Sequence, residues 1–100
     1  MQVDFNGRTC RLSFGRYGNH RPALSLVDPT TGEPVATCTV NIPELELASD
    51  EILVKDYSEN SGMLKALESA GVVRPTGKCV QSGFVRIPVC KLLVQPGARA

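Results

Sequence analysis

The sequence predicts an α+β fold: a mainly antiparallel sheet of five to six strands with a single helix, at about residues 59–69, packed on one face. Short segments that alternate apolar and polar side chains fill the first forty positions and return near the end. Turn-forming residues separate these segments. Only one segment, which ends before Gly71, places apolar side chains at helical spacing.

The first forty residues are predicted to form a four-stranded meander. Asn6-Gly7 is the strongest short hairpin signal, and apolar residues alternate with polar ones on both sides of it. Residues 15–21 form a loop, and residues 28–32 form a turn rich in Asp, Pro, Thr and Gly. The expected strands are residues 3–5, 10–14, 23–27 and 35–40.

The middle of the chain is expected to hold an edge segment or a loop. Pro43 cannot donate a hydrogen bond to a central strand, and the apolar segment that follows, residues 52–54, is short. Within residues 44–47 the two glutamates alternate with two leucines, so the leucines should point inward and the glutamates toward water.

The predicted helix begins at residue 59 or 61 and ends at residue 69, with Ser58 or Asn60 as its N-cap and Gly71 as its C-terminal stop. So short a helix must dock on the sheet through its apolar face. That face consists of Met63, Leu64 and Leu67.

Three further strand segments are expected in the last third of the chain. Residues 72–73 and 79–80 can form a small hairpin around residues 75–77, and residues 83–92 can form a final strand. Pro88 places that strand at an edge or gives it a bulge.

The chain is expected to be one globular domain over residues 1–93, followed by a loose tail over residues 94–100. A length of 100 residues fits one domain, since a single core usually serves about 100 to 150 residues. The hydrophobic fraction of 42% allows such a core to be buried. Residues 95–100 contain no large apolar side chain that could hold the end of the chain.

We expect a cytoplasmic protein, because the beginning of the sequence lacks the pattern of a secretory signal and no apolar run is long enough to cross a membrane. The four cysteines, which form no C-x-x-C pair, are expected to be mostly buried and reduced. Their spacing, with a single histidine in the chain, argues against a zinc site. No phosphate-binding glycine loop occurs, so no cofactor is expected. The cysteines are Cys10, Cys38, Cys79 and Cys90.

Catalysis has few candidate groups in this sequence. His20 is the one histidine, and it lies in a polar loop where an exposed surface role is the simpler interpretation. Glu44 and Glu46 could act as an acid and a base, but they fit the wet side of an edge segment better. We therefore expect a protein that is not an enzyme, and an enzyme centred on His20 stays as a third alternative.

The two ends of the sequence are basic and the middle is acidic. Such segregation influences the choice of partner. The first hypothesis is a partner-binding patch in the acidic middle, in which an exposed tyrosine flanked by acids contacts a basic surface. This patch comprises Glu44, Glu46, Asp56, Tyr57 and Glu59. The simpler interpretation of residues 55–60 is a capped helix start with Tyr57 as a hydrophobic staple.

The alternative hypothesis is a single-stranded nucleic-acid-binding module on a basic sheet face, made by Arg8, Arg11, Arg86 and Lys91 if the first and last strands are neighbours. Of the five aromatic residues, we expect Phe5, Phe14 and Phe84 to pack in the core. The two tyrosines that remain, Tyr17 and Tyr57, do not make a stacking platform, which weighs against this alternative.

Several segments resemble a family of small uncharacterised proteins carried on bacterial plasmids, integrative elements and phages. The resemblance extends from about residue 2 to residue 93, and residues 56–64 are its most specific part. The family has no assigned activity, so the resemblance implies a context and no site. The segments are Tyr17-Gly18-Asn19-His20-Arg21-Pro22-Ala23-Leu24, Gly32-Glu33-Pro34-Val35-Ala36-Thr37, Val40-Asn41-Ile42-Pro43, Lys55-Asp56-Tyr57-Ser58-Glu59-Asn60-Ser61-Gly62-Met63-Leu64 and Ser82-Gly83-Phe84-Val85.

That context implies a non-enzymatic accessory protein of a mobile element that binds a host protein or ribonucleoprotein complex. An anti-CRISPR-type inhibitor of a nucleic-acid-processing defence complex is the specific form that we expect. Such an inhibitor needs shape and charge complementarity to its target and no catalytic group.

Overall fold

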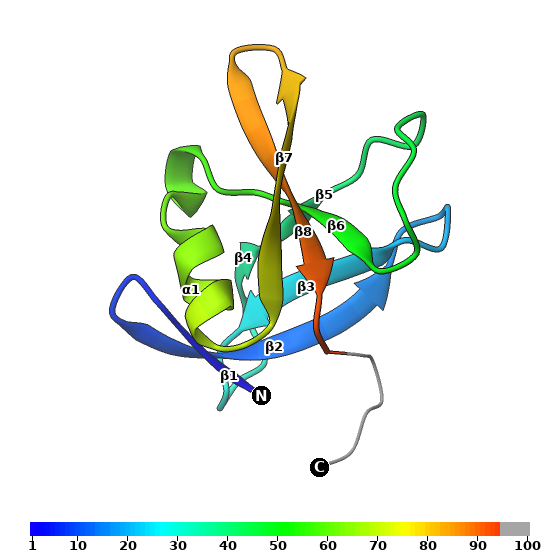
Figure 1. Ribbon diagram of the computed structural model, residues 1–100. Helices are drawn as coiled ribbons and strands as arrows, with labels where there is room; N and C mark the ends of the chain where they lie inside the picture. Colours follow the sequence, from blue (N-terminus) through cyan, green and yellow to red (C-terminus); the bar gives the residue numbers. More distant parts are fainter. Residues whose placement is uncertain (95–100) are drawn as a thin grey trace.

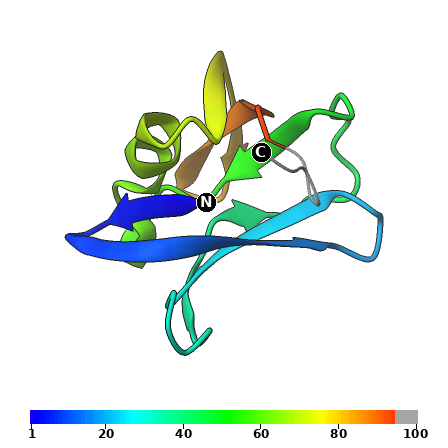
Figure 2. The same cartoon turned by 90° about the horizontal axis from the view of Figure 1, so that it is seen from below.

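Two antiparallel four-stranded sheets form two layers of the molecule, with one α-helix beside them (Figures 1 and 2). The computed structural model describes residues 1–94. The predicted α+β class, with mainly antiparallel strands and one α-helix, is confirmed, although the strands number eight and are split between two sheets. The first sheet contains, in spatial order, β1 (Gln2–Phe5), β2 (Arg8–Arg16), β3 (Pro22–Val27) and β4 (Pro34–Thr37). The second contains β5 (Thr39–Val40), β6 (Glu51–Val54), β8 (Val85–Leu92) and β7 (Val73–Ser82).

The N-terminal hairpin forms as predicted. Phe5 pairs with Arg8 across a turn in which Asn6 and Gly7 have φ values of 51° and 74°. Positive φ at both central residues is the requirement of a type I′ turn, and Asn-Gly meets it at low cost. The alternation continues into β2, where Cys10 and Leu12 are buried.

The predicted single strand over residues 35–40 is wrong, because the chain crosses from the first sheet to the second at Cys38. This residue is fully buried between β4 and β5. Its N–H donates to the carbonyl of Leu24 in the first sheet, and its carbonyl accepts from the N–H of Lys55 at the end of β6. One buried residue thus connects the two layers through its backbone.

The second sheet differs from the prediction in three ways. First, β6 is an interior strand between β5 and β8, not an edge. Second, residues 73–82 form one strand with an irregularity between Pro75 and Cys79, not a hairpin. Third, the real turn is Gly83-Phe84, which joins β7 to β8.

The expectation that Pro88 places its strand at an edge or gives it a bulge is wrong in part, because β8 lies between β6 and β7 and the irregularity lies in β7, between Pro75 and Cys79. The last β6–β8 pair is Leu53 with Val89, so β8 has no β6 partner at Pro88, and the irregularity of β7 begins one residue beyond the Cys79–Pro88 pair. A residue without an N–H is tolerated where the ladder already ends.

The helix starts later than predicted. Helix α1 spans Met63–Ser69 with Gly62 as its N-cap, and Ser58–Asn60 form a separate 3₁₀ turn, η1. The predicted stop is confirmed: Gly71 has a φ of 76°, and its N–H and that of Val72 donate to the carbonyls of Glu68 and Leu67. These two bonds form a Schellman motif.

The apolar side chains form two cores. The larger lies between the two sheets and includes Met63 and Leu67 of α1, which confirms that the helix docks through this face. The smaller lies on the opposite side of the second sheet, which we call the outer face. There Leu53, Ile87 and Val89 are buried beneath half-buried apolar neighbours, which are Val40, Ile42, Leu45, Leu47, Tyr57, Val80 and Val85.

The expected domain over residues 1–93 lies within the described part of the chain. Residues 1–94 contain both cores. The predicted tail over residues 94–100 lies, apart from Val94, outside the described residues.

Substitution of Asn60 tests whether its side-chain hydrogen bonds help to hold the two layers together. Only 2% of this residue is exposed, and its Nδ2 donates to the carbonyls of Thr37 in β4 and Lys55 after β6. In Asn60→Ala both carbonyls lose a donor, so we expect the free energy of unfolding to fall by about 2 kcal/mol in urea titrations. The exposed neighbour Ser61→Ala should change it by less than about 0.5 kcal/mol. Equal stability of the two variants would contradict this role.

Candidate functional site

The most exposed large apolar side chain of the described residues is Phe84, with a relative exposure of 106%. It lies at the tip of the β7–β8 hairpin, which extends away from the body of the molecule (Figure 1). The prediction that Phe84 packs in the core is therefore wrong. Phe84 lies outside β8, because this strand begins at the next residue, Val85, and not at residue 83 as expected.

The turn that carries Phe84 is tight, and strand pairing and one side-chain hydrogen bond close it. Gly83 has a φ of 58° and Phe84 has no positive φ, as in a type II′ turn, which requires glycine at its first central position. Ser82 pairs with Val85, and Gln81 pairs with Arg86. The Gln81 Nε2 also donates to the Gly83 carbonyl at 2.9 Å. A Gly-aromatic pair between two strand segments was the sequence signal for this turn.

The hairpin is basic. Residues 72–94 contain four cationic side chains and no acidic one. Lys78 pairs with Glu51 at 2.9 Å and Lys91 with Asp50 at 3.2 Å. Within residues 1–94, Arg74 and Arg86 form no ion pair.

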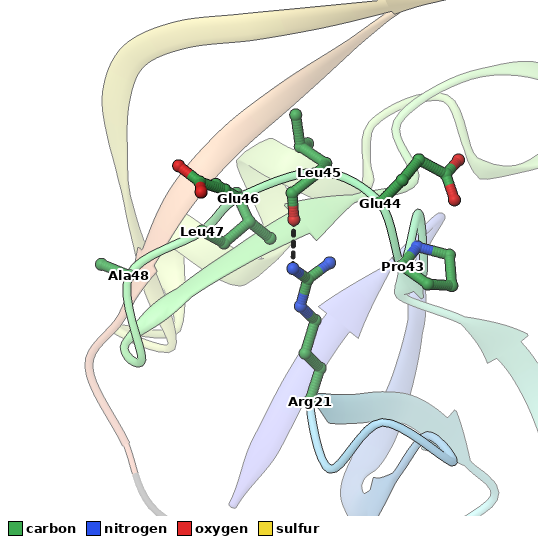
Figure 3. A pocket seen from close by; sticks show the side chains of 7 residues that line it. All are labelled: Arg21, Pro43, Glu44, Leu45, Glu46, Leu47 and Ala48. Carbon is green, nitrogen blue, oxygen red and sulfur yellow. Dashed lines mark hydrogen bonds between the residues drawn. The ribbon is translucent and has the colours of Figure 1, made fainter.

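The loop between β5 and β6 contains the first two residues of the predicted acidic patch. The Arg21 guanidinium donates to the carbonyl of Ile42 at 2.8 Å and to that of Leu45, and so holds the loop in place (Figure 3). Glu44 and Glu46 are exposed, whereas Leu45 is half-buried against the outer face, as is Leu47. The predicted orientation of this segment is confirmed.

This loop encloses an open hollow of about 630 Å³. Arg21 lies at its base, and the carboxylates of Glu44 and Glu46 point away on opposite sides of the loop (Figure 3). The other lining residues are Pro43, Leu45, Leu47 and Ala48. The hollow therefore has a mainly polar lining that includes one cation, several apolar side chains and two acids at its rim.

The other three residues of the acidic patch are engaged within the molecule. The Asp56 Oδ1 accepts from the N–H groups of Gly62 at 3.2 Å and Leu64 at 2.9 Å, so it caps α1. The predicted caps, Ser58 and Asn60, are wrong, because the chain makes a 3₁₀ turn before the helix and the capping side chain comes from six residues upstream.

Tyr57 and Glu59 also have internal contacts. The Tyr57 ring packs with the cluster on the outer face, and the Lys55 ammonium lies 5.9 Å from the ring centroid. Glu59 pairs with Lys55 at 2.8 Å, and this hydrogen bond lowers the pKa of the Glu59 carboxyl. Glu44 and Glu46 are the two acids of the predicted patch that make no hydrogen bond or ion pair within residues 1–94.

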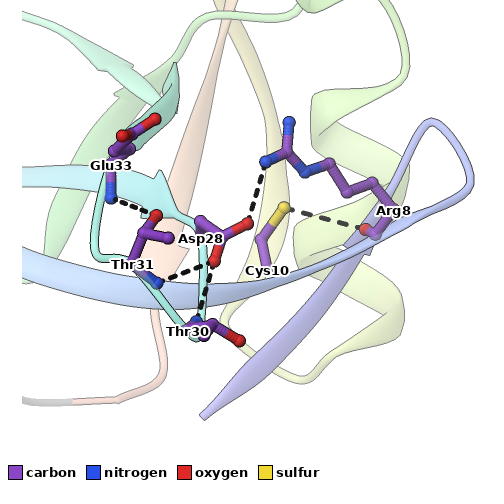
Figure 4. A network of polar contacts seen from close by, with 6 residues as sticks. All are labelled: Arg8, Cys10, Asp28, Thr30, Thr31 and Glu33. Carbon is purple, nitrogen blue, oxygen red and sulfur yellow. Dashed lines mark hydrogen bonds and ion pairs between the residues drawn. The ribbon is translucent and has the colours of Figure 1, made fainter.

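The residues of the basic alternative lie on different layers. Arg8 and Arg11 belong to β2 in the first sheet, whereas Arg86 and Lys91 belong to β8 in the second, so the first and last strands are not neighbours. Arg8 is paired with Asp28 at 3.0 Å (Figure 4). Arg86 is the member that lies closest in sequence to Phe84.

Asp28 belongs to a turn that fixes its ionised form. The backbone N–H groups of Thr31 and Thr30 donate to its Oδ1 at 2.9 and 2.8 Å, and Arg8 donates to its Oδ2 (Figure 4). These contacts, with Thr31 first, lower the pKa of the Asp28 carboxyl to about 2. The network explains why Arg8 is held against the first sheet.

His20 lies in the loop between β2 and β3. His20 has a φ of 69° and borders a hollow of about 220 Å³ with Arg16 and Glu51, and its imidazole makes no hydrogen bond within residues 1–94.

Three of the four cysteines are buried free thiols, which confirms that prediction, and the fourth, Cys79, is exposed. Burial raises the pKa of the Cys38 thiol to about 12 and that of Cys90 to about 11.

Two kinds of feature are absent from the part of the chain that the structure describes. In residues 1–94, no three His, Cys, Asp or Glu side chains lie together as a metal site would require. None of the helices described there has the length and apolar character needed to cross a membrane.

Comparison with models of known protein families, with curated proteins and with solved structures finds no match for this chain.

Asp56 should behave as a helix cap in stability measurements. In Asp56→Ala the two N–H groups lose their acceptor, so we expect the free energy of unfolding to fall by about 1 kcal/mol. Asp56→Asn keeps an acceptor oxygen and should retain most of the stability. Urea titrations that place Asp56→Ala level with the wild type would contradict the capping role.

The Asp28 turn predicts a pH dependence. Because its pKa is lowered in the folded state, Asp28 stabilises the fold above its ordinary pKa of 3.8, and this contribution is lost as the pH falls through about 2. NMR titration of the Asp28 carboxyl should show a pKa near 2 in the wild type. In Arg8→Ala the pKa should rise only in part, because the bonds from Thr31 and Thr30 remain. A return to 3.8 in that variant would show that Arg8 alone causes the shift.

Proposed function

We propose that this chain is a non-enzymatic binding protein that acts by stoichiometric contact with a macromolecular partner, and that Phe84 is its central contact residue. The supporting observation is the full exposure of this ring at the end of a projecting hairpin. Aromatic side chains dominate the binding energy of many interfaces. Burying such a ring in a partner's pocket contributes about 1.5–3 kcal/mol.

The hairpin presents the ring in a prearranged form. The turn is closed by the Ser82–Val85 and Gln81–Arg86 pairs and by the side-chain bond from Gln81. Little backbone freedom remains to be lost when a partner binds, which favours affinity. The projecting shape suits a concave site on the partner.

The acidic loop forms the second part of the proposed surface. Glu44 and Glu46 are exposed and uncommitted within the described residues, so they are available to a basic partner surface. Tyr57 lies on the same outer face as Leu45 of this loop. Asp56 and Glu59 supply negative charge nearby while they stabilise the segment before α1.

The more specific hypothesis is that the partner is a host protein or ribonucleoprotein complex, and that the chain is a mobile-element accessory protein of the anti-CRISPR type. It is supported by the resemblance of segments such as residues 56–64 and 82–85 to a family from plasmids, integrative elements and phages. A basic surface that normally holds nucleic acid would be complementary to Glu44 and Glu46.

A second candidate function is single-stranded nucleic-acid binding. The observation that favours it is the position of Arg86 two residues from Phe84 on a hairpin without acidic side chains. Bases can stack on an exposed aromatic ring while arginines contact phosphates. Affinity of this kind would fall steeply as the salt concentration rises.

Affinity capture from a host lysate distinguishes these functions. With the tagged wild type we expect a protein partner near equimolar amount that is retained after nuclease treatment, and Phe84→Ala should reduce its yield at least tenfold, since loss of a central aromatic typically costs 2 kcal/mol or more, or about 30-fold in affinity. The matched control is Leu93→Ala, which shortens another exposed apolar side chain.

Two outcomes would change the conclusion. Equal capture by the wild type and Phe84→Ala would remove Phe84 from the binding surface. Retention that disappears with the nucleic acid would favour the second candidate function.

A further inference from the structure

Both halves of a complementary contact are present on this one chain. The first is the hairpin tip, which we define as Gly83, Phe84 and Arg86. The second is the hollow of the β5–β6 loop, with the Arg21 guanidinium at its base and the apolar side chains of Pro43 and Leu47 within a mainly polar lining. A phenyl ring fits such a site, because it can stack on a guanidinium and pack against the neighbouring apolar side chains.

The charges of the two halves are opposite. Arg86 has no ion-pair partner within residues 1–94, and the residues from 72 to 94 include no acid. The rim of the hollow carries Glu44 and Glu46, which are exposed. Opposite charges at the edge of a contact steer association and fix its register.

The tip does not fill the hollow of its own molecule. Phe84 is fully exposed, and the hairpin extends away from the body of the protein. In Figure 1 the tip and the β5–β6 loop both lie in the upper half of the molecule, away from the two termini. A second copy rotated by 180° can therefore offer its hollow to this tip and receive its own tip in return, which is the arrangement of a two-fold interface.

We propose that two copies of this chain associate reciprocally, with Phe84 of each copy in the β5–β6 hollow of the other and Arg86 against Glu44 and Glu46. The dimer and the partner of the proposed function compete for Phe84. Self-association therefore covers this residue until a partner that binds more tightly displaces the second copy. The dimer needs only the chain itself and can be tested without that partner.

Sedimentation equilibrium of the purified protein is the first test. One ring and a few charges on each side make a small contact, so the dimer should be weak and appear between about 10 μM and 1 mM protein. The average mass should rise with concentration from the monomer value of 10.7 kDa toward twice that value. Phe84→Ala should stay monomeric throughout.

A charge exchange tests which surfaces meet. R86E places an acid opposite the acidic rim, and E44K/E46K places cations opposite Arg86, so each variant alone should be monomeric. In an equimolar mixture of the two variants both reciprocal contacts are again between opposite charges. The mixture should recover association within about threefold of the wild type. E68K, which reverses an exposed acid on α1, should associate like the wild type.

Each outcome is decisive for the inference. A wild type that stays monomeric up to 1 mM, association of Phe84→Ala equal to that of the wild type, or a mixture that remains monomeric would overturn it. Growth of the mass beyond the dimer would overturn the reciprocal arrangement. The recovery in the mixture also shows that both variants are folded. None of these results affects capture of a lysate partner, so failure here is distinguishable from failure of the proposed function.

Discussion

The arrangement of the molecule depends on the crossing between the two sheets at residues 37–39. Cys38 and Thr39 are almost fully buried, and each is bonded to both layers. The Cys38 backbone joins Leu24 to Lys55, and the Thr39 hydroxyl accepts from the N–H of Leu24 and meets the Tyr17 hydroxyl at 2.8 Å. Buried polar groups are costly unless they are satisfied, so this set of bonds strongly favours one placement of the second sheet over the first.

This placement gives the two sides of the second sheet different environments. One side closes the main core, and the other, the outer face, carries a second cluster covered by the β5–β6 loop and Tyr57. Because β6 ends at Val54, its neighbour β8 continues past it together with β7. The continuation forms the projecting hairpin, and its turn places Phe84 in water. The projecting hairpin and its exposed ring are thus consequences of the different lengths of the strands in this sheet.

The sequence predicted the features that depend on neighbouring residues. The Asn6-Gly7 turn, the stop at Gly71 and the alternation of residues 44–47 each follow from local backbone or side-chain preferences. The crossing at Cys38 was missed, because a run of β-branched and small residues looks the same whether it stays in one sheet or passes to another. Strand β7 was missed because Pro75 and Gly77 resemble a turn, while the pairing with β8 that overrides them is remote in sequence.

The candidate site was predicted only in part. Glu44 and Glu46 are exposed as expected, but Asp56 serves as a cap for α1, which composition and spacing did not reveal. Phe84 was expected in the core because the final strand was predicted to begin at residue 83, before it. Its exposure depends on whether the turn falls on Gly83-Phe84 or earlier, and that is decided by the register between β7 and β8.

Fluorine NMR of the protein labelled with 4-fluorophenylalanine tests the role of Phe84 most directly. The chain has three phenylalanines, of which Phe5 is buried and Phe14 is half-buried, so they serve as internal references. In dilute protein, addition of nuclease-treated host lysate should broaden or shift the Phe84 resonance far more than slow tumbling broadens the two references. A Phe84 signal that stays sharp at its solvent-exposed position, at a lysate concentration that yields a captured partner, would contradict the account.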